Sequence, residues 1–215
     1  MRITKDADER KNEILNVANE LFARKGFDAT TISDIIEKVG VARGTVYYHF
    51  KSKEDVLDAL IERTNLELLT AAKKVADDKS IPVMDRFFQA LRAMNAEDDA
   101  GILEQMHRPQ NALMHQKSQE AFLVGATPIL AEIIRDGIEE NVFNTPFPYE
   151  SVELFMAYIS TVLDDGFLRL AEEERLPRIQ AFIYNAEIVF GVKQGSFAWM
   201  GHLFGIEDED GGVIV

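Results

Sequence analysis

Apolar side chains recur every three or four residues along most of this chain, which is the spacing of one buried face on an α-helix. The pattern predicts helices near 14–25, 31–39, 42–50, 53–76, 82–95 and 112–140, and two strongly apolar helices at 149–171 and 175–204. Pro128 predicts a kink or a break within 112–140. No segment alternates apolar and polar residues with the period of a strand. We therefore expect an all-α fold.

The most specific pattern lies in residues 31–53. Thr31 can cap a short helix, and Asp34 can reach back to the cap amide, as in a capping box. Gly40 follows at the point where the chain must reverse, and glycine enters the left-handed backbone conformation without a steric penalty. A second short helix follows at once. Two short helices joined by such a turn are typical of a helix-turn-helix, which reads DNA.

The second short helix has two different faces. Val46 and Phe50 share one face and are expected to point into the core. The other face offers side chains that suit a DNA groove, namely Arg43, Thr45, Tyr47, Tyr48 and His49. A tyrosine pair alone is more often the edge of a core, and a lone histidine is more often an ordinary surface residue. Their combination with two caps and a glycine turn favours DNA binding.

A third helix is expected to begin near Lys53, because Ser52 and Asp55 repeat the capping pattern. A lysine at a helix N-terminus lies where the backbone amides and the helix dipole already favour a phosphate. Lys53 is therefore predicted to contact the DNA backbone.

A dense run of residues between positions 8 and 55 carries a family resemblance. The run consists of Ala18, Leu21, Phe22, Gly26, Phe27, Thr30, Thr31, Ile35, Gly40, Val41, Gly44, Thr45, Tyr47, Tyr48, His49, Phe50, Lys53 and Leu57. In this run the chain resembles the N-terminal DNA-binding domain of the TetR/AcrR family of bacterial transcriptional regulators.

The resemblance implies a division of roles among the DNA-binding residues. Base edges and the nearby sugar-phosphate would be faced by Arg43, Gly44, Thr45 and Tyr47. Phosphates would mainly be held by Thr31, Ser33, Tyr48, His49 and Lys53. Gly44 departs from family members that carry a bulkier residue there, so its contact would come from the backbone alone.

The resemblance also implies an organisation for the whole chain. We expect a DNA-binding domain at 1–55, a helical regulatory and dimerisation domain at 56–206, and an acidic, glycine-containing tail at 207–215. The implied function is a transcriptional regulator, more readily a repressor than an activator, that binds a palindromic DNA operator as a homodimer. The helices at 149–171 and 175–204 would form the dimer interface, since they offer more apolar surface than one buried face each requires. The alternative is that they form the central core of a monomer.

A small-molecule pocket among the C-terminal helices is a further implication, with an apolar or amphipathic effector. The candidate lining residues are Phe87, Leu91, Met94, Leu103, Met106, His107, Met114, Phe122, Tyr158 and Phe167. Methionine suits adaptable apolar sites, but methionine and phenylalanine at helical spacing are more often core, and that alternative stays open. A metal site would need Glu104, His107 and His115 to converge. The alternative is two ordinary polar histidines, and we expect neither a metal nor a cofactor.

Charge is distributed unevenly along the chain, whose net charge is −14. Residues 1–55 contain ten basic and ten acidic side chains, whereas residues 56–215 contain thirteen and twenty-seven. Residues 24–53 contain six basic and three acidic side chains, and a DNA-binding surface can use this local excess of positive charge. Because the acidic remainder would be repelled by DNA, we expect strongly salt-dependent binding and modest non-specific affinity.

The remaining composition narrows the function classes. The chain has no cysteine, so disulfides and cysteine chemistry are excluded. Its first residues lack a signal-peptide pattern and no apolar run is long enough to span a bilayer, so we expect a soluble, cytoplasmic protein. No phosphate-binding loop or nucleophile motif is present, and we expect no enzyme activity. Two alternatives remain: an acidic all-helical small-molecule-binding protein with a vestigial DNA-binding segment, and a helical enzyme within 80–200.

Overall fold

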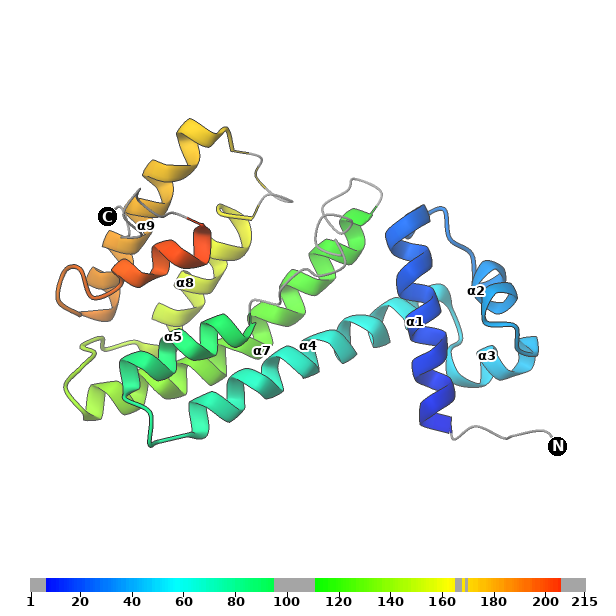
Figure 1. The fold of residues 1–215 in the computed structure, drawn as a ribbon, viewed down its shortest axis with the longest axis horizontal. Coiled ribbons are helices and arrows are strands. Elements are labelled where there is room, and N and C mark those ends of the chain that lie inside the picture. Colours follow the sequence, from blue (N-terminus) through cyan, green and yellow to red (C-terminus); the bar gives the residue numbers. More distant parts are fainter. Residues whose placement is uncertain (1–6, 95–110, 165–167, 169, 206–215) are drawn as a thin grey trace. The chain divides into compact units, whose positions relative to one another are not determined.

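The computed structural model describes residues 7–94, 111–164, 168 and 170–205 (Figure 1). This part of the chain forms α-helices and one 3-10 helix and contains no strand, which confirms the predicted all-α fold. The elements are α1 (Ala7–Lys25), α2 (Ile32–Val39), α3 (Arg43–His49), α4 (Lys53–Asp77), α5 (Val83–Met94), α7 (Ala112–Glu139), α8 (Pro148–Thr161), α9 (Glu172–Phe190) and the 3-10 helix η2 (Ala198–Phe204).

The chain divides into two compact units. Among the described residues, the first unit contains 7–66 and 111–121, and the second contains 67–94 and 122–205. Two helices, α4 and α7, begin in the first unit and end in the second. The first unit is therefore not the continuous segment 1–55, because it also takes the first turns of α4 and a piece of chain from beyond position 110.

The first unit packs the predicted helix faces around one core. Ile14, Leu15, Ala18, Leu21 and Phe22 form the buried face of α1, at the three- and four-residue spacing of a helix. They share a cluster with buried side chains of α2, α3, α4 and α7, which are Ile35, Val46, Val56, Leu57, Leu60, Ile61 and Met114. This core fixes α2 and α3 on α1, which Figure 1 shows beside them.

The second unit is organised around Phe87 of α5, which is fully buried. Its ring centroid lies between 5.7 and 6.0 Å from those of four other phenylalanines, supplied by α8, α9 and the loops that follow α7 and α9. These are Phe143, Phe155, Phe190 and Phe197. Most of these pairs are tilted or edge-to-face, the arrangements that the quadrupoles of aromatic rings favour.

The last two predicted helices have different ends from those expected. The prediction of one helix over 175–204 is wrong, because α9 stops at Phe190 and Gly191 adopts a left-handed conformation with φ of 63°. A Cβ at Gly191 would lie 2.2 Å from the carbonyl oxygen of Asn144, so only glycine fits this close approach. The predicted helix 149–171 is also too long, since α8 ends at Thr161. Apolar residues continue past both ends, so their periodicity did not mark where the helices stop.

Pro128 does not break its helix, because α7 continues through it. Proline lacks the amide that would bond the carbonyl of Val124, one turn earlier. Pro128 lies on the exposed side of α7 and Val124 is itself 67% exposed, so water can satisfy that carbonyl. The position of the proline on the solvent side explains why the helix tolerates it.

Candidate nucleic-acid interface

The N-terminus of α2 carries the predicted capping box. The Thr31 hydroxyl accepts the Asp34 amide at 3.1 Å, and the Asp34 carboxylate accepts the Thr31 amide at 2.8 Å. Asp34 also forms an ion pair with Lys25, at 3.0 Å. The hydrogen bond from the Thr31 backbone, with further help from Lys25, lowers the pKa of Asp34 from 3.8 to about 2. This end of α2 is therefore fixed locally, with the Ser33 side chain exposed beside it.

The turn between α2 and α3 follows the sequence prediction. Gly40 ends α2 in the left-handed conformation, with φ of 72°, and its amide bonds the Ile36 carbonyl at 3.1 Å. Val46 is fully buried and Phe50 is 3% exposed, so the predicted inward face of α3 is confirmed. The helix-turn-helix is thus present, and the opposite side of α3 faces away from its core.

That outward side carries the predicted DNA-binding residues. Arg43 and Gly44 are exposed, Tyr47 is 36% exposed and Tyr48 is 80% exposed, while Thr45 and His49 are half-buried. An 80% exposed tyrosine is unusual for a residue whose ring favours burial, so Tyr48 contributes nothing to the core of this unit.

Two pairs of side chains order this exposed face. The Arg43 guanidinium lies 5.3 Å from the centre of the Tyr47 ring, one helical turn later, and is 3.4 Å from its hydroxyl. The rings of Tyr48 and His49 meet edge to face at 5.1 Å. Arg43 therefore has a neighbour that can hold its planar group in place, which favours directional contact with a base edge.

Lys53 is engaged within the protein. α4 begins at Lys53 as predicted, and the Ser52 hydroxyl accepts the Asp55 amide at 3.1 Å. The Lys53 ammonium donates to the Phe27 carbonyl at 2.7 Å and lies 4.2 Å from the centre of the Phe27 ring. Its charge therefore stabilises the turn after α1, in addition to any phosphate it binds.

The local excess of basic side chains in 24–53 is smaller than the composition suggests. Lys25 is paired with Asp34, and Lys38 forms an ion pair with Glu20, whose pKa is lowered by that lysine. Glu20 lies outside the counted segment, so the sequence count left it out. Electrostatic attraction to DNA at this face consequently depends on fewer uncompensated cations than six.

Sequence reasoning missed one group of residues in this unit. Asn111 is 1% exposed and its side-chain oxygen accepts the Phe27 amide at 2.8 Å. Met114 is 6% exposed within the same core, and Lys117 forms an ion pair with Asp58 of α4. Position in the chain gave no signal for these contacts, because they lie more than 50 residues from their partners.

The predicted effector-binding residues do not all lie together. Phe87, Leu91 and Met94 are buried in the core of the second unit, and Phe122 packs partly buried against it. Met114 belongs to the core of the first unit. Tyr158 is half-buried and stacks on Phe182 with centroids 5.1 Å apart. The other four candidates, Leu103, Met106, His107 and Phe167, fall outside the described residues.

A largely apolar groove of about 170 Å³ lies between α8 and α9. Its lining residues include Phe155 and Tyr158 from α8 and Phe182 and Val189 from α9. Large apolar side chains are exposed on the same two helices: Leu154 is 61%, Tyr184 49% and Ile188 60% exposed. Such an exposed apolar surface is typical of a protein–protein interface.

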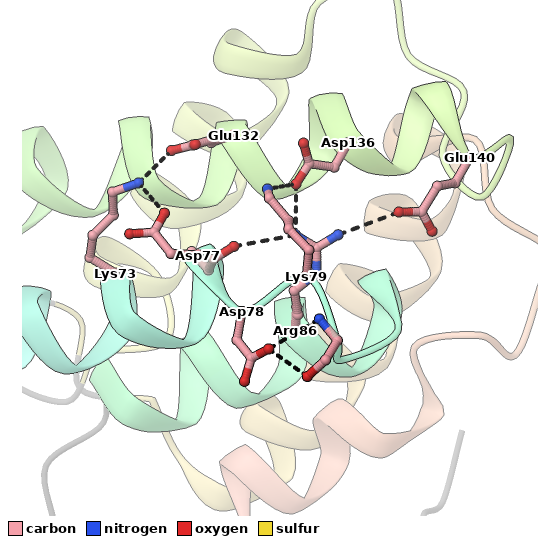
Figure 2. Close-up of polar contacts among 10 residues, drawn as sticks. Lys73, Asp77, Asp78, Lys79, Arg86, Glu132, Asp136 and Glu140 are labelled. Carbon is pink, nitrogen blue, oxygen red and sulfur yellow. Dashed lines mark hydrogen bonds and ion pairs between the residues drawn. The ribbon is translucent and has the colours of Figure 1, made fainter.

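A set of charged side chains joins α4, α5 and α7 in the second unit (Figure 2). Arg86 of α5 is 1% exposed and donates to Asp136 at 2.6 Å and to the Ala76 carbonyl at 3.2 Å. Burial acts to raise the pKa of Asp136, but hydrogen bonds from Lys79 and Arg86 outweigh it and lower the pKa below its usual value. Arg86 therefore fastens the C-terminal end of α4 to α7.

The described residues contain neither a candidate metal site nor a membrane-spanning helix. The described residues contain no group of three or more histidine, aspartate or glutamate side chains placed to hold a metal. His115 is 8% exposed, whereas Glu104 and His107 lie outside the described ranges. None of the described helices is both long and apolar enough to cross a membrane.

Comparison with known families matches both parts of the chain. Residues 14–60 match the family "Bacterial regulatory proteins, tetR family", and residues 93–188 match "Tetracyclin repressor-like, C-terminal domain". The first match contains α2, α3 and the start of α4, and thus the whole helix-turn-helix.

Individual relatives agree with this assignment. The chain is 28% identical over 167 residues to the HTH-type transcriptional repressor KstR2 of Mycobacterium tuberculosis, covering 72% of this chain and 80% of that protein. It is 32% identical over 136 residues to the fatty acid metabolism regulator protein of Bacillus subtilis, covering 59% and 67%. The fold resembles that of SmeT from Stenotrophomonas maltophilia in its triclosan complex, with a TM-score of 0.54 and 20% identity over 87% of this chain and 94% of SmeT.

Proposed function

This chain belongs to the TetR family of bacterial regulatory proteins, and we propose that it is a repressor that binds a palindromic operator as a homodimer and dissociates when a small apolar effector binds the second unit. TetR-family proteins are DNA-binding transcriptional regulators and generally not enzymes. The KstR2 relative is named a transcriptional repressor, which favours repression here.

The exposed face of α3 is the observation that carries the DNA-binding role. Its polar and aromatic side chains are accessible, while Val46 and Phe50 anchor the helix from behind. The Arg43 guanidinium is placed to bond a guanine edge with Tyr47 beside it. Gly44 can contribute its backbone, because no side chain separates the helix from an approaching base.

Phosphate contacts would flank this base-reading face. Thr31 and Ser33 lie at the N-terminus of α2, where the helix dipole favours an anion. Tyr48 and His49 at the C-terminal end of α3 can donate to the opposite strand. Lys53 would add a charge to this set while it continues to hold the Phe27 carbonyl.

Dimerisation through α8 and α9 explains their apolar surface. Leu154 of α8 lines the groove between the two helices, and it is exposed together with Tyr184 and Ile188 of α9, each by about half or more in the single chain. Because a two-fold dimer presents the same patch twice, side chains of one copy can fill the groove of the other. Two recognition helices would then be held at the spacing of two half-sites.

The effector is proposed to be apolar because the second unit offers an aromatic interior. Phe87 is surrounded by rings, and Leu91 and Met94 extend the same apolar core along α5. SmeT, which shares the fold, has been described in a complex with triclosan. Binding would favour one arrangement of the second unit and thereby shift the population of DNA-competent dimers.

Selection of bound duplexes from a random library tests this proposal. We expect the purified protein to enrich a palindrome, and an Arg43→Ala, Tyr47→Ala double variant to enrich none. The single Arg43→Ala variant should bind the enriched site with a free energy weaker by about 1–3 kcal/mol and show a relaxed preference at one base pair.

The same experiment tests the first alternative, and a turnover assay tests the second. A vestigial DNA-binding segment would give no enrichment at low salt, and the protein would then be an acidic helical ligand-binding protein. A helical enzyme within 80–200 would have to show turnover that is lost on changing one polar residue of that segment.

A further inference from the structure

The turn between α1 and α2, residues 26–30, is held by side chains from two distant parts of the chain. Asn111 lies immediately before α7 and accepts the Phe27 amide on its Oδ1 atom at 2.8 Å, across 84 positions of sequence. Lys53 donates to the carbonyl of the same residue at 2.7 Å. Both backbone polar groups of Phe27 are therefore satisfied by side chains outside the turn.

The orientation of the Asn111 carboxamide is fixed by its surroundings. Its oxygen faces the Phe27 N–H, and its Nδ2 atom faces the Phe22 carbonyl near the end of α1, at 3.5 Å. In the reverse orientation, the carboxamide oxygen would face the Phe22 carbonyl and the amide nitrogen would face the Phe27 N–H. Neither contact would then pair a donor with an acceptor. Since Asn111 is 1% exposed, water cannot readily replace either contact.

The segment that supplies Asn111 is built into the first unit. Met114 is 6% exposed in the core that also contains Phe22 and Phe27. Lys117 forms an ion pair with Asp58 on α4. These contacts anchor residues 111–117 on both sides of Met114, so Asn111 is held against the turn by packing as well as by its own hydrogen bonds.

We propose that Asn111 is a positioning residue for DNA binding. It fixes the Phe27 peptide, and this sets the turn that leads through Thr30 into Thr31 and the N-terminus of α2. Thr30 transmits the constraint, because its hydroxyl donates to the Gly26 carbonyl at 2.7 Å. The proposal rests on the proposed function, in which Thr31 and Ser33 hold phosphates.

The contact between Asn111 and Phe27 also links the DNA-binding unit to α7. α7 begins one residue after Asn111 and continues into the second unit, where Gly125 and Asp136 contact Leu69 and Arg86. A displacement of the start of α7 would therefore act on the Phe27 amide as well as on any contact made through α4. The DNA-binding unit thus depends on a residue from the part of the chain that the sequence assigned to regulation.

The test compares Asn111→Ala with Met114→Ala, which also truncates a buried side chain of this segment but has no hydrogen bond to Phe27. Operator binding is measured by fluorescence anisotropy at a temperature where both variants are folded, and amide exchange at Phe27 is measured by NMR. We expect Asn111→Ala to raise the operator Kd roughly tenfold and to accelerate Phe27 exchange. Met114→Ala should lower the melting temperature and leave the Kd unchanged.

Three results would overturn the proposal. One is an unchanged operator Kd in Asn111→Ala, and another is an equal loss of affinity in both variants, which would indicate general destabilisation. The third needs no variant: exchange of the Phe27 amide in the native protein as fast as in an exposed turn. Arg43→Ala is measured alongside. A loss of operator affinity in Arg43→Ala with none in Asn111→Ala would refute only the positioning role of Asn111. Wild-type affinity in both variants would also refute the proposed DNA-binding face.

Discussion

Replacing Gly44 by alanine should strengthen the fold and weaken DNA binding at the same time. Gly44 lies in the first turn of α3 and a Cβ added there would meet no protein atom within 4 Å. Alanine in a helix is more stable than glycine, so the free energy of unfolding should rise by about 0.4–1 kcal/mol. If the bare backbone approaches a base edge, the added methyl group would crowd that contact and cost about 1–3 kcal/mol of operator affinity.

Gly40→Ala is the matched control for this experiment. A Cβ at Gly40 would also meet no atom within 4 Å, but its φ of 72° is left-handed, so alanine should destabilise by about 1–2 kcal/mol. Stability is measured by urea unfolding, and affinity by fluorescence anisotropy on the selected operator. Operator binding by Gly44→Ala equal to that of the wild type would show that this backbone does not approach DNA, and a loss of stability would refute the helical account of the position.

Four further substitutions test three other sets of contacts. Lys53→Ala should weaken binding to cognate and random DNA alike and flatten the salt slope by about one unit, since a phosphate contact is lost; a wild-type slope would limit Lys53 to its role at the Phe27 carbonyl. The pKa of Asp34 is lowered from 3.8 to about 2, so its contribution to stability is present above pH 4 and disappears as the pH falls towards 2. Asp34→Asn should therefore show a shallower loss of stability over this range, and an unchanged acid slope would contradict the ion pair and the cap. Arg86→Met should lower the free energy of unfolding, measured in urea, by about 2–3 kcal/mol. This is less than the usual effect of breaking a buried ion pair, because Asp136 is 25% exposed and keeps its ion pair with Lys79. Lys79→Met, which removes an exposed lysine, should cost less than about 1 kcal/mol, and equal losses in the two variants would refute the special role of Arg86.

The helix-turn-helix could be predicted because its determinants are local. Thr31 and Asp34 are three residues apart and satisfy each other within one turn, and Gly40 needs only its own backbone freedom to end α2. Val46 and Phe50 share a helix face by spacing alone. Each of these features depends on chemistry within a single turn, so the residue order was sufficient.

Features that depend on distant contacts were not predictable in this way. Asn111 bonds Phe27 across 84 positions and Met114 joins the core of the same unit, yet nothing in the local sequence distinguishes these two residues from residues of the second unit. Gly191 did offer a local signal for the end of α9, but the apolar residues on either side of it continued the helical pattern. Its close approach to Asn144 shows that packing decided where the helix stops.

The distance between the two α3 helices shows whether the protein binds its operator as a dimer held together by α8 and α9. The chain has no cysteine, so Lys51→Cys, exposed two residues beyond α3, provides a single site for a spin label. On operator DNA, double electron–electron resonance should give one narrow distance, consistent with recognition helices roughly 34–36 Å apart in successive major grooves. Adding Ile188→Glu, which places a charge on the proposed α9 interface, should abolish the coupling. Absence of coupling on operator DNA, or a distance that Ile188→Glu leaves unchanged, would contradict a repressor dimerised through α8 and α9.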